Sequence, residues 1–451
     1  MAQIINLKKG LDIILKGDPL EIVGKAVQSE LIGFVPDHFA GIVPKPVAKV
    51  GDKLKVGSVL FMDKNCPELK IVSPVSGELV AVNRGERRKI LDIVIKNDFQ
   101  MEQEVLSSIN FATASAEQVK SALLSAGLFA FIKQRPYDVV ANPLDIPKAI
   151  FISTFDSAPL APDFNFIVNN QLADFQAGIS ALSKLATVNL GVKAGNTLFD
   201  ATKDATITYF KGAHPAGNVG IQINHINPIN KGEVVWTINP QEVLFIGRYA
   251  NTGKLDFSKL VAYTGSEATT PAYYPLLVGS PITPVVKENV SKGVHLRYIS
   301  GNVLSGEKIA ADGFLNPFHS QISVIPEGDE THELVGWITP RFNRFSNSGT
   351  YLTKLIQFLQ PKKKFEADAR LLGGVRHMIM SGEYDSVLPM DIYPEFLFKA
   401  IIANDIDKME ALGIYEIAPE DVALCEFVCS SKMPLQKIVR EGLDMLRKEM
   451  I

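Results

Sequence analysis

The chain has 451 residues, more than one hydrophobic core usually serves, so we expect three or four domains. Hydrophobic residues make up 46% and charged residues 21%, which are ordinary values for a globular protein. The net charge of −3 argues against a nucleic-acid-binding protein. No apolar stretch of about 20 residues and no secretory leader is present, so we expect a cytoplasmic protein without a transmembrane segment.

Residues 1–100 alternate short apolar runs with Gly and Pro, a pattern typical of a small β domain. Within them, residues 50–60 and 72–80 resemble the two halves of a biotinyl/lipoyl carrier domain. The segment 63–70 between these halves contains Lys64 and Lys70, but it lacks the flanking residues of a modified lysine. We therefore interpret this region as a carrier-like structural module, with a modified carrier as the alternative.

Residues 101–255 alternate helical and strand patterns, which predicts a Rossmann-like α/β domain. Ser115 and Gln118 have the spacing of a capping box, and Asn239 with Pro240 predicts the start of another helix. Strands are expected at 149–153, 188–192, 205–210 and 233–238. No glycine-rich dinucleotide or phosphate fingerprint is present, so we expect no independent NADH site in this chain.

Residues 256–336 return to short β patterns, and residues 337–451 are mainly helical. Strands are expected at 260–263, 294–299, 321–325 and 333–338. A helix is expected from Asp405 to Leu412, closed by Gly413. A final helix is predicted by an apolar stripe made of Leu435, Ile438, Val439, Leu443 and Leu446.

The loop 211–220, Lys-Gly-Ala-His-Pro-Ala-Gly-Asn-Val-Gly, follows an expected strand. We therefore expect it at the carboxyl end of the sheet, where open α/β folds bind ligands. Gly217 and Gly220 permit close backbone approach, and His214 can donate a hydrogen bond to a carbonyl oxygen. The alternative is a Gly/Pro connection with a solvated histidine, and both interpretations apply equally to the nearby His225.

Cys425 and Cys429 share one helix face if residues 419–429 are helical. An iron–sulfur cluster ordinarily needs four cysteines, and the third cysteine, Cys66, lies far away in the sequence. We therefore expect buried free thiols. The histidines lack the spacing of a zinc site, so no metal is expected either.

Several segments, in order, resemble the NqrA family of sodium-translocating NADH:quinone oxidoreductase subunits nearly from end to end. They are 4–12, 43–46, 49–52, 73–77, 214–217, 235–238, 299–306, 391–394, 411–413 and 420–425. That family is related to the RnfC protein of the Rnf complex and to a flavin-bearing subunit of respiratory complex I. The resemblance implies an α/β multidomain fold with a carrier-like β domain (1–100), a Rossmann-like domain (101–255), a β-grasp, soluble-ligand-binding domain (256–336) and a helical domain (337–451).

The resemblance also implies a peripheral subunit on the cytoplasmic side of the bacterial inner membrane. Its complex would transfer electrons from NADH to ubiquinone while exporting Na⁺, and NADH, flavins, iron–sulfur and ubiquinone would be handled by the complex. This chain would carry no cofactor and no active site of its own. Its partners would be other subunits, chiefly an integral membrane subunit, with ubiquinone as a further candidate and no nucleic acid.

The candidate contacts for quinone or for a partner are His214, Pro215, Gly217, Gly220 and His225. The spacing of Cys425 and Cys429 matches the last two positions of the iron–sulfur cysteine motif found in the related proteins. The resemblance therefore implies that these two cysteines are a degenerate remnant of that motif. A purely structural adaptor and a free-standing carrier-domain protein are the two alternatives.

Overall fold

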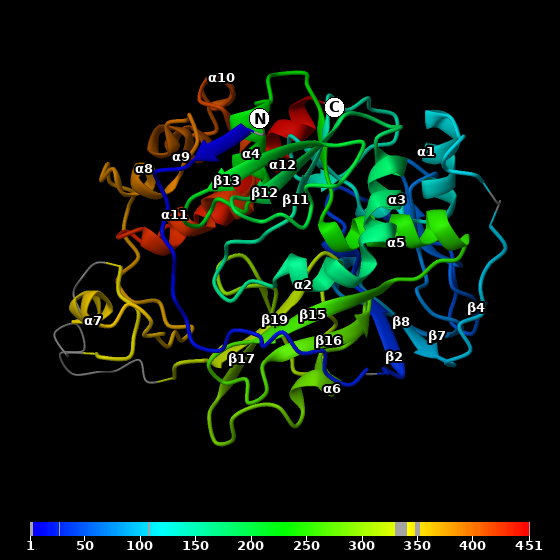
Figure 1. Ribbon diagram of the computed structural model, residues 1–451, viewed down its shortest axis with the longest axis horizontal. Coiled ribbons are helices and arrows are strands. Elements are labelled where there is room, and N and C mark those ends of the chain that lie inside the picture. Colours follow the sequence, from blue (N-terminus) through cyan, green and yellow to red (C-terminus); the bar gives the residue numbers. More distant parts are fainter. Residues whose placement is uncertain (1–2, 27, 107–108, 330–340, 348–351, 451) are drawn as a thin grey trace.

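The computed structural model describes residues 3–26, 28–106, 109–329, 341–347 and 352–450 (Figure 1). Its strands form sheets of seven, five, four and three strands, and helices dominate the C-terminal region. The strand expected at 333–338 lies outside the described residues. The chain is therefore a mixed α/β protein with several sheets and a helical C-terminal region, as predicted at this level.

The N-terminal region contains two small sheets around one apolar core. In the four-stranded sheet the order is β2 (Leu31–Phe34), β8 (Ile90–Asn97), β7 (Gly77–Arg84) and β4 (Lys53–Leu54), all antiparallel. The other sheet contains β3 (Pro44–Pro46), β5 (Val59–Asp63) and β6 (Lys70–Val72). The short runs of apolar residues expected in this region are thus strands, with Ile32, Phe61 and Ile95 buried in their core.

The seven-stranded sheet contains a strand from the extreme N-terminal part of the chain. Its order is β1 (Gln3–Asn6), β13 (Thr206–Lys211), β12 (Val188–Lys193), β11 (Ile150–Ser153), β14 (Val235–Thr237), β9 (Lys133–Arg135) and β10 (Val139–Val140). Strands from β1 to β14 are parallel, whereas β9 and β10 are antiparallel to their neighbours. Residues 7–26 then run past the C-terminal region, where Leu15 bridges to Phe365, to the five-stranded sheet, where Val23 bridges to Tyr273.

Both faces of the seven-stranded sheet are covered. Because side chains alternate along a strand, Ile150 and Ile152 pack on one side with α3 (Leu172–Leu182) and α5 (Pro240–Thr252). Phe151 packs on the other side with α4 (Val219–Ile226) and the C-terminal helices. Helices α3 and α5 touch so closely that a Cβ on Gly247 would lie 1.7 Å from the carbonyl oxygen of Asp174.

Two helix starts were predicted in this region. Ser115 and Gln118 form the predicted capping box at the start of α1 (Ala116–Ser125). Pro240 is the first residue of α5 as predicted, although the Asn239 side chain makes no capping hydrogen bond. The short α2 (Phe164–Val168) precedes α3.

The five-stranded sheet follows in the chain. Its order is β16 (Ala272–Leu277), β15 (Ser258–Thr264), β19 (Gln321–Pro326), β17 (Leu296–Ser300) and β18 (Glu307–Ile309), and α6 (Thr283–Val286) packs against its core. The pair β15–β19 is parallel and the other pairs are antiparallel.

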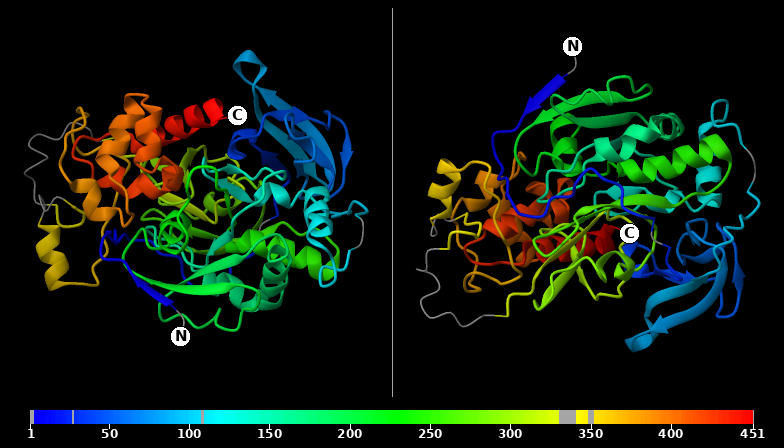
Figure 2. Two further views of the ribbon diagram at one scale, coloured as in Figure 1. Left: turned by 90° about the horizontal axis from the view of Figure 1, so that it is seen from above. Right: turned by 60° about the horizontal axis from the view of Figure 1, so that its bottom comes forward.

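Most helices of the C-terminal region lie at the opposite end of the molecule from the β-rich N-terminal region, but the last helix runs back to it (Figure 2), where Arg447 Nη2 donates to the carbonyl of Gly41 at 3.3 Å. Its helices are α7 (Thr353–Leu359), α8 (Glu383–Val387), α9 (Pro394–Ile402), α10 (Ile406–Ala411), α11 (Ala423–Val428) and α12 (Leu435–Met450). The predicted stripe on α12 is confirmed, with Ile438 partly buried and its other members fully buried. Asp405 caps α10, and Gly413 follows it with φ 92°. Of the helices described, none has the length and apolar character needed to span a membrane.

Short 3-10 helices connect several of these elements. They are η1 (Pro36–His38), η2 (Glu86–Arg88), η3 (Phe129–Phe131), η4 (Asn169–Gln171), η5 (Ile414–Glu416) and η6 (Pro419–Val422).

Candidate functional site

The loop that contains His214 joins β13 to α4 at the carboxyl end of the parallel strands, where it was expected. Pro215, Ala216 and Gly217 are buried, and the His214–Pro215 peptide bond is cis. The backbone N–H of His214 donates to Asp12 Oδ1 at 2.8 Å, and its carbonyl accepts the N–H of Leu11 at 2.8 Å. The loop is thus clamped by the segment that follows β1.

The His214 side chain is buried, with 4% of its surface exposed, so the alternative of a solvated histidine is wrong. Its Nδ1 lies 3.0 Å from Ser157 Oγ, which also accepts the N–H of Gly217 at 2.8 Å. Burial lowers the pKa of His214 to about 4, because the charged imidazolium loses its hydration. At neutral pH the ring is therefore uncharged, and Ser157 holds both the ring and the loop backbone.

The two glycines of the loop permit close approach, but the groups that approach belong to this chain. A Cβ on Gly217 would lie 2.6 Å from the backbone nitrogen of Ser157. A Cβ on Gly220 would lie 2.3 Å from Asp421 Oδ2 in the C-terminal region. Gly217 therefore allows the loop to pack against residues 155–157 of the same α/β region, whereas Gly220 allows α4 to pack directly against the helical C-terminal region.

His225 lies at the other end of α4, away from the buried His214. Its Nδ1 is 2.9 Å from the carbonyl oxygen of Ile221, and its ring lines an open cleft of about 270 Å³. Lys8 and Lys9, which follow β1, line the same cleft, together with Met390 and Asp391 from the C-terminal region. His225 is therefore the sequence-predicted candidate that a ligand or partner reaches from outside.

A buried ion pair lies beside the loop and had no sequence signal. Arg135 Nη1, at the end of β9, is 2.5 Å from Asp421 Oδ2, and both side chains are almost fully buried. Burial opposes the charge on Arg135, but Asp421 and Asp138 hold its pKa above the usual value. The Nδ2 of Asn218 in the loop donates to the carbonyl of Glu420 at 3.2 Å, which extends the junction. Arg135 and Asp421 lie far apart in the chain, so sequence spacing alone does not predict that they pair.

A second buried polar group joins the five-stranded sheet to the rest of the protein. Lys259 Nζ lies 3.2 Å from Glu242 Oε1, and both side chains are buried. His319 Nδ1 lies 2.9 Å from Ser300 Oγ, and burial lowers the pKa of His319 to about 3. Glu242 lies in the first turn of α5, whose start the sequence predicts at Asn239 and Pro240.

Cys425 and Cys429 are free thiols, and each is only 1% exposed. Cys425 lies in α11, while Cys429 follows its last residue and sits 2.9 Å from the hydroxyl of Tyr384. Burial raises the pKa of the Cys425 thiol. Among the described residues, no group of three or more His, Cys, Asp and Glu side chains is arranged to hold a metal ion.

The segment 63–70 joins β5 to β6. Asp63 Oδ1 accepts the backbone N–H groups of Val43 at 3.0 Å and Asn65 at 3.2 Å, which fixes the turn. Lys64 and Lys70 are thus placed in and beside a tight connection between strands.

Together, the mixed sheets, the helical C-terminal region and the buried charged junctions define a multidomain α/β protein. Family models match three successive parts of the chain. They are the NqrA N-terminal barrel-sandwich hybrid domain over residues 5–98, the NqrA second alpha/beta domain over 114–255 and the NQRA C-terminal domain over 260–311.

Curated relatives match over the full length. The NqrA subunit of the Na(+)-translocating NADH-quinone reductase of Serratia proteamaculans (strain 568) is 34% identical over 454 residues, which cover 99% of this chain and 100% of the relative. The corresponding proteins of Haemophilus influenzae (strain PittGG) and Yersinia pestis are 34% and 33% identical with the same coverage. This chain belongs to the NqrA family of Na(+)-translocating NADH-quinone reductase subunits.

Solved structures give a weaker similarity. A chain of a NAD⁺-reducing NiFe hydrogenase in the H₂-reduced state is 11% identical, with a TM-score of 0.37, over 78% of this chain and 67% of that chain. A similarity of this size does not bear on fold or function.

Proposed function

We propose that this chain is the peripheral NqrA subunit of a Na⁺-translocating NADH:ubiquinone reductase, an enzyme of the translocase class. The observation that carries this proposal is the 34% identity over 99% of this chain and 100% of a relative with that role in its name. Colinearity over the whole length supports the same place in the same kind of complex. The chain contributes to the quinone-reduction end of electron transfer, which is coupled to Na⁺ export.

The finer fold assignments are part of the proposal. Four adjacent parallel strands with helices on both faces support a Rossmann-like α/β domain at 101–255, with β1 as a fifth parallel strand at its edge. The mixed five-stranded sheet supports a β-grasp domain at 256–336. The antiparallel sheets that flank the turn at 63–70 support a carrier-like domain at 1–100, and the helices support a separate domain at 337–451.

The division of labour follows from what the residues can do. NADH and flavins are handled by other subunits, because the loop after β13 has no glycine fingerprint and this chain's own atoms occupy the space beside its glycines. Iron–sulfur is handled by other subunits as well. Cys425 and Cys429 are a degenerate remnant of a cluster motif. The partners are the other subunits, chiefly an integral membrane subunit, on the cytoplasmic side of the inner membrane.

Contact with quinone or with the quinone-binding subunit is assigned to His214, Pro215, Gly217, Gly220 and His225. The exposed His225 lies beside Lys8 and Lys9 in the cleft and is the direct contact. The buried, uncharged His214 and its glycines set the position of α4, which carries His225. The competing function is a structural adaptor that never meets a substrate.

Deletion of this chain tests the proposal. Membranes that lack it should lose Na⁺-coupled quinone reduction while they keep NADH oxidation by artificial acceptors, because electron entry lies in other subunits. Co-purification from native membranes should recover this chain with integral membrane subunits. If the chain purifies alone and its deletion leaves quinone reduction intact, the proposal is wrong.

A further inference from the structure

The C-terminal region presents apolar side chains to solvent on a short helix. In α7, Leu355, Phe358 and Leu359 have the spacing of one helix face, yet they are 57%, 81% and 69% exposed. An apolar stripe on a helix normally faces a core. This stripe faces away from the molecule.

The loop 371–380 also exposes apolar side chains to solvent. Val375, Ile379 and Met380 are exposed, with 72% of Val375 accessible. The loop is nevertheless fixed: the N–H of Arg376 donates to the carbonyl of Ser431 at 2.9 Å. At its end, the buried Glu395 accepts the N–H groups of residues 381 and 382 at 2.9 and 2.7 Å. Hydrogen bonds therefore anchor the loop at residue 376 and just after its end, while its apolar side chains remain exposed.

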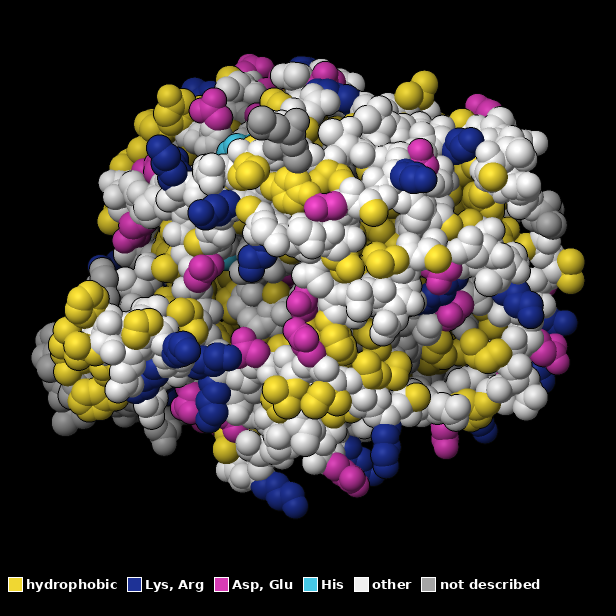
Figure 3. All heavy atoms as spheres, viewed as in Figure 1, with side chains coloured by type: hydrophobic (Ala, Val, Ile, Leu, Met, Phe, Trp, Pro, Cys, Tyr) yellow, Lys and Arg dark blue, Asp and Glu magenta, His cyan; other side chains and the backbone are white. Residues whose placement is uncertain are grey.

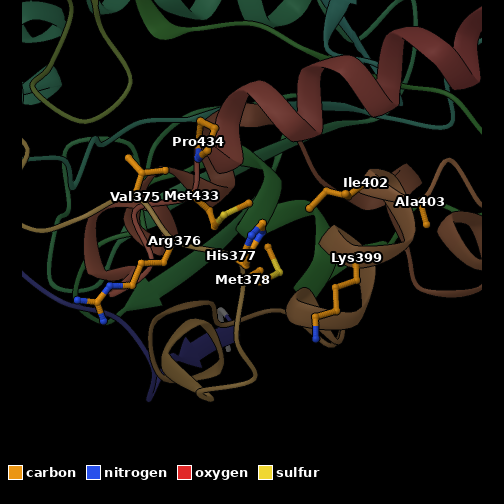
Figure 4. A pocket seen from close by; sticks show the side chains of 9 residues that line it. All are labelled: Val375, Arg376, His377, Met378, Lys399, Ile402, Ala403, Met433 and Pro434. Carbon is orange, nitrogen blue, oxygen red and sulfur yellow. The ribbon is translucent and has the colours of Figure 1, made fainter.

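A groove of about 580 Å³ lies beside this loop, with Met378, Ile402 and Met433 among its lining residues (Figure 4). Arg376 and Lys399 lie on opposite sides of the groove, with their side chains extending away from its centre (Figure 4). Cations therefore flank an apolar surface.

Positive charge is concentrated in the same part of the chain. Residues 361–380 contain five Lys and Arg but two Asp and Glu, although the whole chain has a net charge of −3. No carboxylate of the described residues pairs with Lys362, Lys363, Arg376 or Lys399. Hydrophobic side chains cover α7, and Lys and Arg side chains lie beside them, with Asp and Glu side chains close by (Figure 3).

We infer that α7, residues 362–363 and the loop 371–380 form a docking surface for an anionic phospholipid bilayer. Exposed Leu and Phe beside Lys and Arg are typical of segments that lie in the membrane interface, where the cations meet lipid phosphates. The inference rests on the proposed function, which brings the chain to a membrane. The cytoplasmic loops of integral membrane proteins carry an excess of Lys and Arg, so their charge would repel this surface.

Vesicle binding by the purified full-length chain tests the inference. We expect sedimentation with vesicles of phosphatidylethanolamine and phosphatidylglycerol, weak binding to phosphatidylcholine vesicles, and release by salt. Lys362→Glu with Lys363→Glu, and separately Phe358→Asp, should weaken binding at least about ten-fold. The controls are Lys45→Glu with Lys49→Glu, and Ile146→Asp, which alter exposed side chains elsewhere and should bind like wild type.

A photo-crosslinking residue at position 358 of the assembled complex separates lipid from protein. A lipid adduct supports the inference, whereas a peptide adduct from another subunit overturns it. Equal binding by the altered and control variants overturns it as well. If the chain co-purifies with its complex but ignores anionic vesicles, the docking surface is wrong while the proposed function stands.

Discussion

Arg135 and Asp421 are 286 residues apart in the chain, yet their side chains meet at 2.5 Å in the protein interior. Asp421 Oδ2 also accepts the backbone N–H of Ala418 at 2.9 Å. The pair therefore fixes the helical C-terminal region onto the end of the seven-stranded sheet, directly beside the loop that carries His214.

Removal of either partner should destabilise the protein strongly. Arg135→Ala or Asp421→Ala leaves one buried charge unpaired, and we expect a loss of about 3–5 kcal/mol in the free energy of unfolding. The double variant Arg135→Met with Asp421→Leu should lose less than either single change, because neither charge then remains buried. Urea unfolding measures all three. The exposed pair Lys53–Glu78 is the control, and Lys53→Ala should leave the unfolding midpoint unchanged. Losses no larger than that of the control would contradict this prediction.

Gly220 should resist even the smallest side chain. Its Cβ would meet the carboxylate of Asp421, so Gly220→Ala must push the ion pair apart and should cost about 1–3 kcal/mol. Gly374→Ala is the matched control, since its Cβ would meet only Arg376 Nε, at 3.9 Å. Thermal unfolding of both variants compares the two sites. Equal midpoints would mean that the junction adjusts freely.

The buried His214 should make stability depend on pH. Its pKa is about 4 in the folded protein and about 6.5 when exposed, so the unfolded chain binds more protons between these values. Stability should therefore fall as pH falls from 6.5 to 4, by up to about 3 kcal/mol from this group. In His214→Asn this contribution disappears while an acceptor for Ser157 remains. Unfolding free energies at several pH values, compared between wild type and variant, isolate it from the similar His319. Parallel curves would show that His214 is not buried.

Local patterns were sufficient to predict local structure. The capping box at Ser115, the glycine that closes α10 and the stripe on α12 depend on neighbours three to seven residues apart, and the structure confirms them. The loop around His214 was also placed correctly, because a strand followed by a glycine-rich segment fixes which end of the sheet it occupies.

Contacts between distant parts of the chain could not be predicted in this way. The strand β1 lies in the seven-stranded sheet, and nothing in its four residues specifies β13 as its neighbour. Likewise, no sequence pattern around Arg135 or Asp421 predicts that these two residues form an ion pair. The sequence allows two interpretations of His214, because its burial depends on Asp12 and Ser157, which no spacing rule connects to it.

Thiol reactivity should distinguish the three cysteines. Cys66 is partly exposed, whereas Cys425 and Cys429 are buried, and burial raises the pKa of the Cys425 thiol. A thiol reagent should therefore modify Cys66 first and reach the other two only on unfolding, because the thiolate is the reactive form. Peptide mapping after timed labelling of the native chain measures the order. Rapid labelling of Cys425 would mean that α11 opens readily.

The last prediction concerns quinone kinetics and the two histidines of the candidate site. His225→Ala removes an exposed contact in the cleft without disturbing the core, so it should raise the KM for quinone several-fold, the equivalent of about 0.5–1.5 kcal/mol, and leave kcat unchanged. His214→Ala should have a similar or smaller effect on KM, because it acts through the position of α4. Gly217→Val should do more, since its side chain meets the backbone of Ser157 and displaces both the loop and the histidine.

Steady-state kinetics on assembled variant complexes provide this measurement, with subunit stoichiometry as the check on assembly. His295→Ala is the control, because it removes another exposed histidine, next to β17, and should leave KM unchanged. A KM for His225→Ala that equals the control value in a fully assembled complex would assign the cleft to partner contact or to structure. It would leave quinone to other subunits.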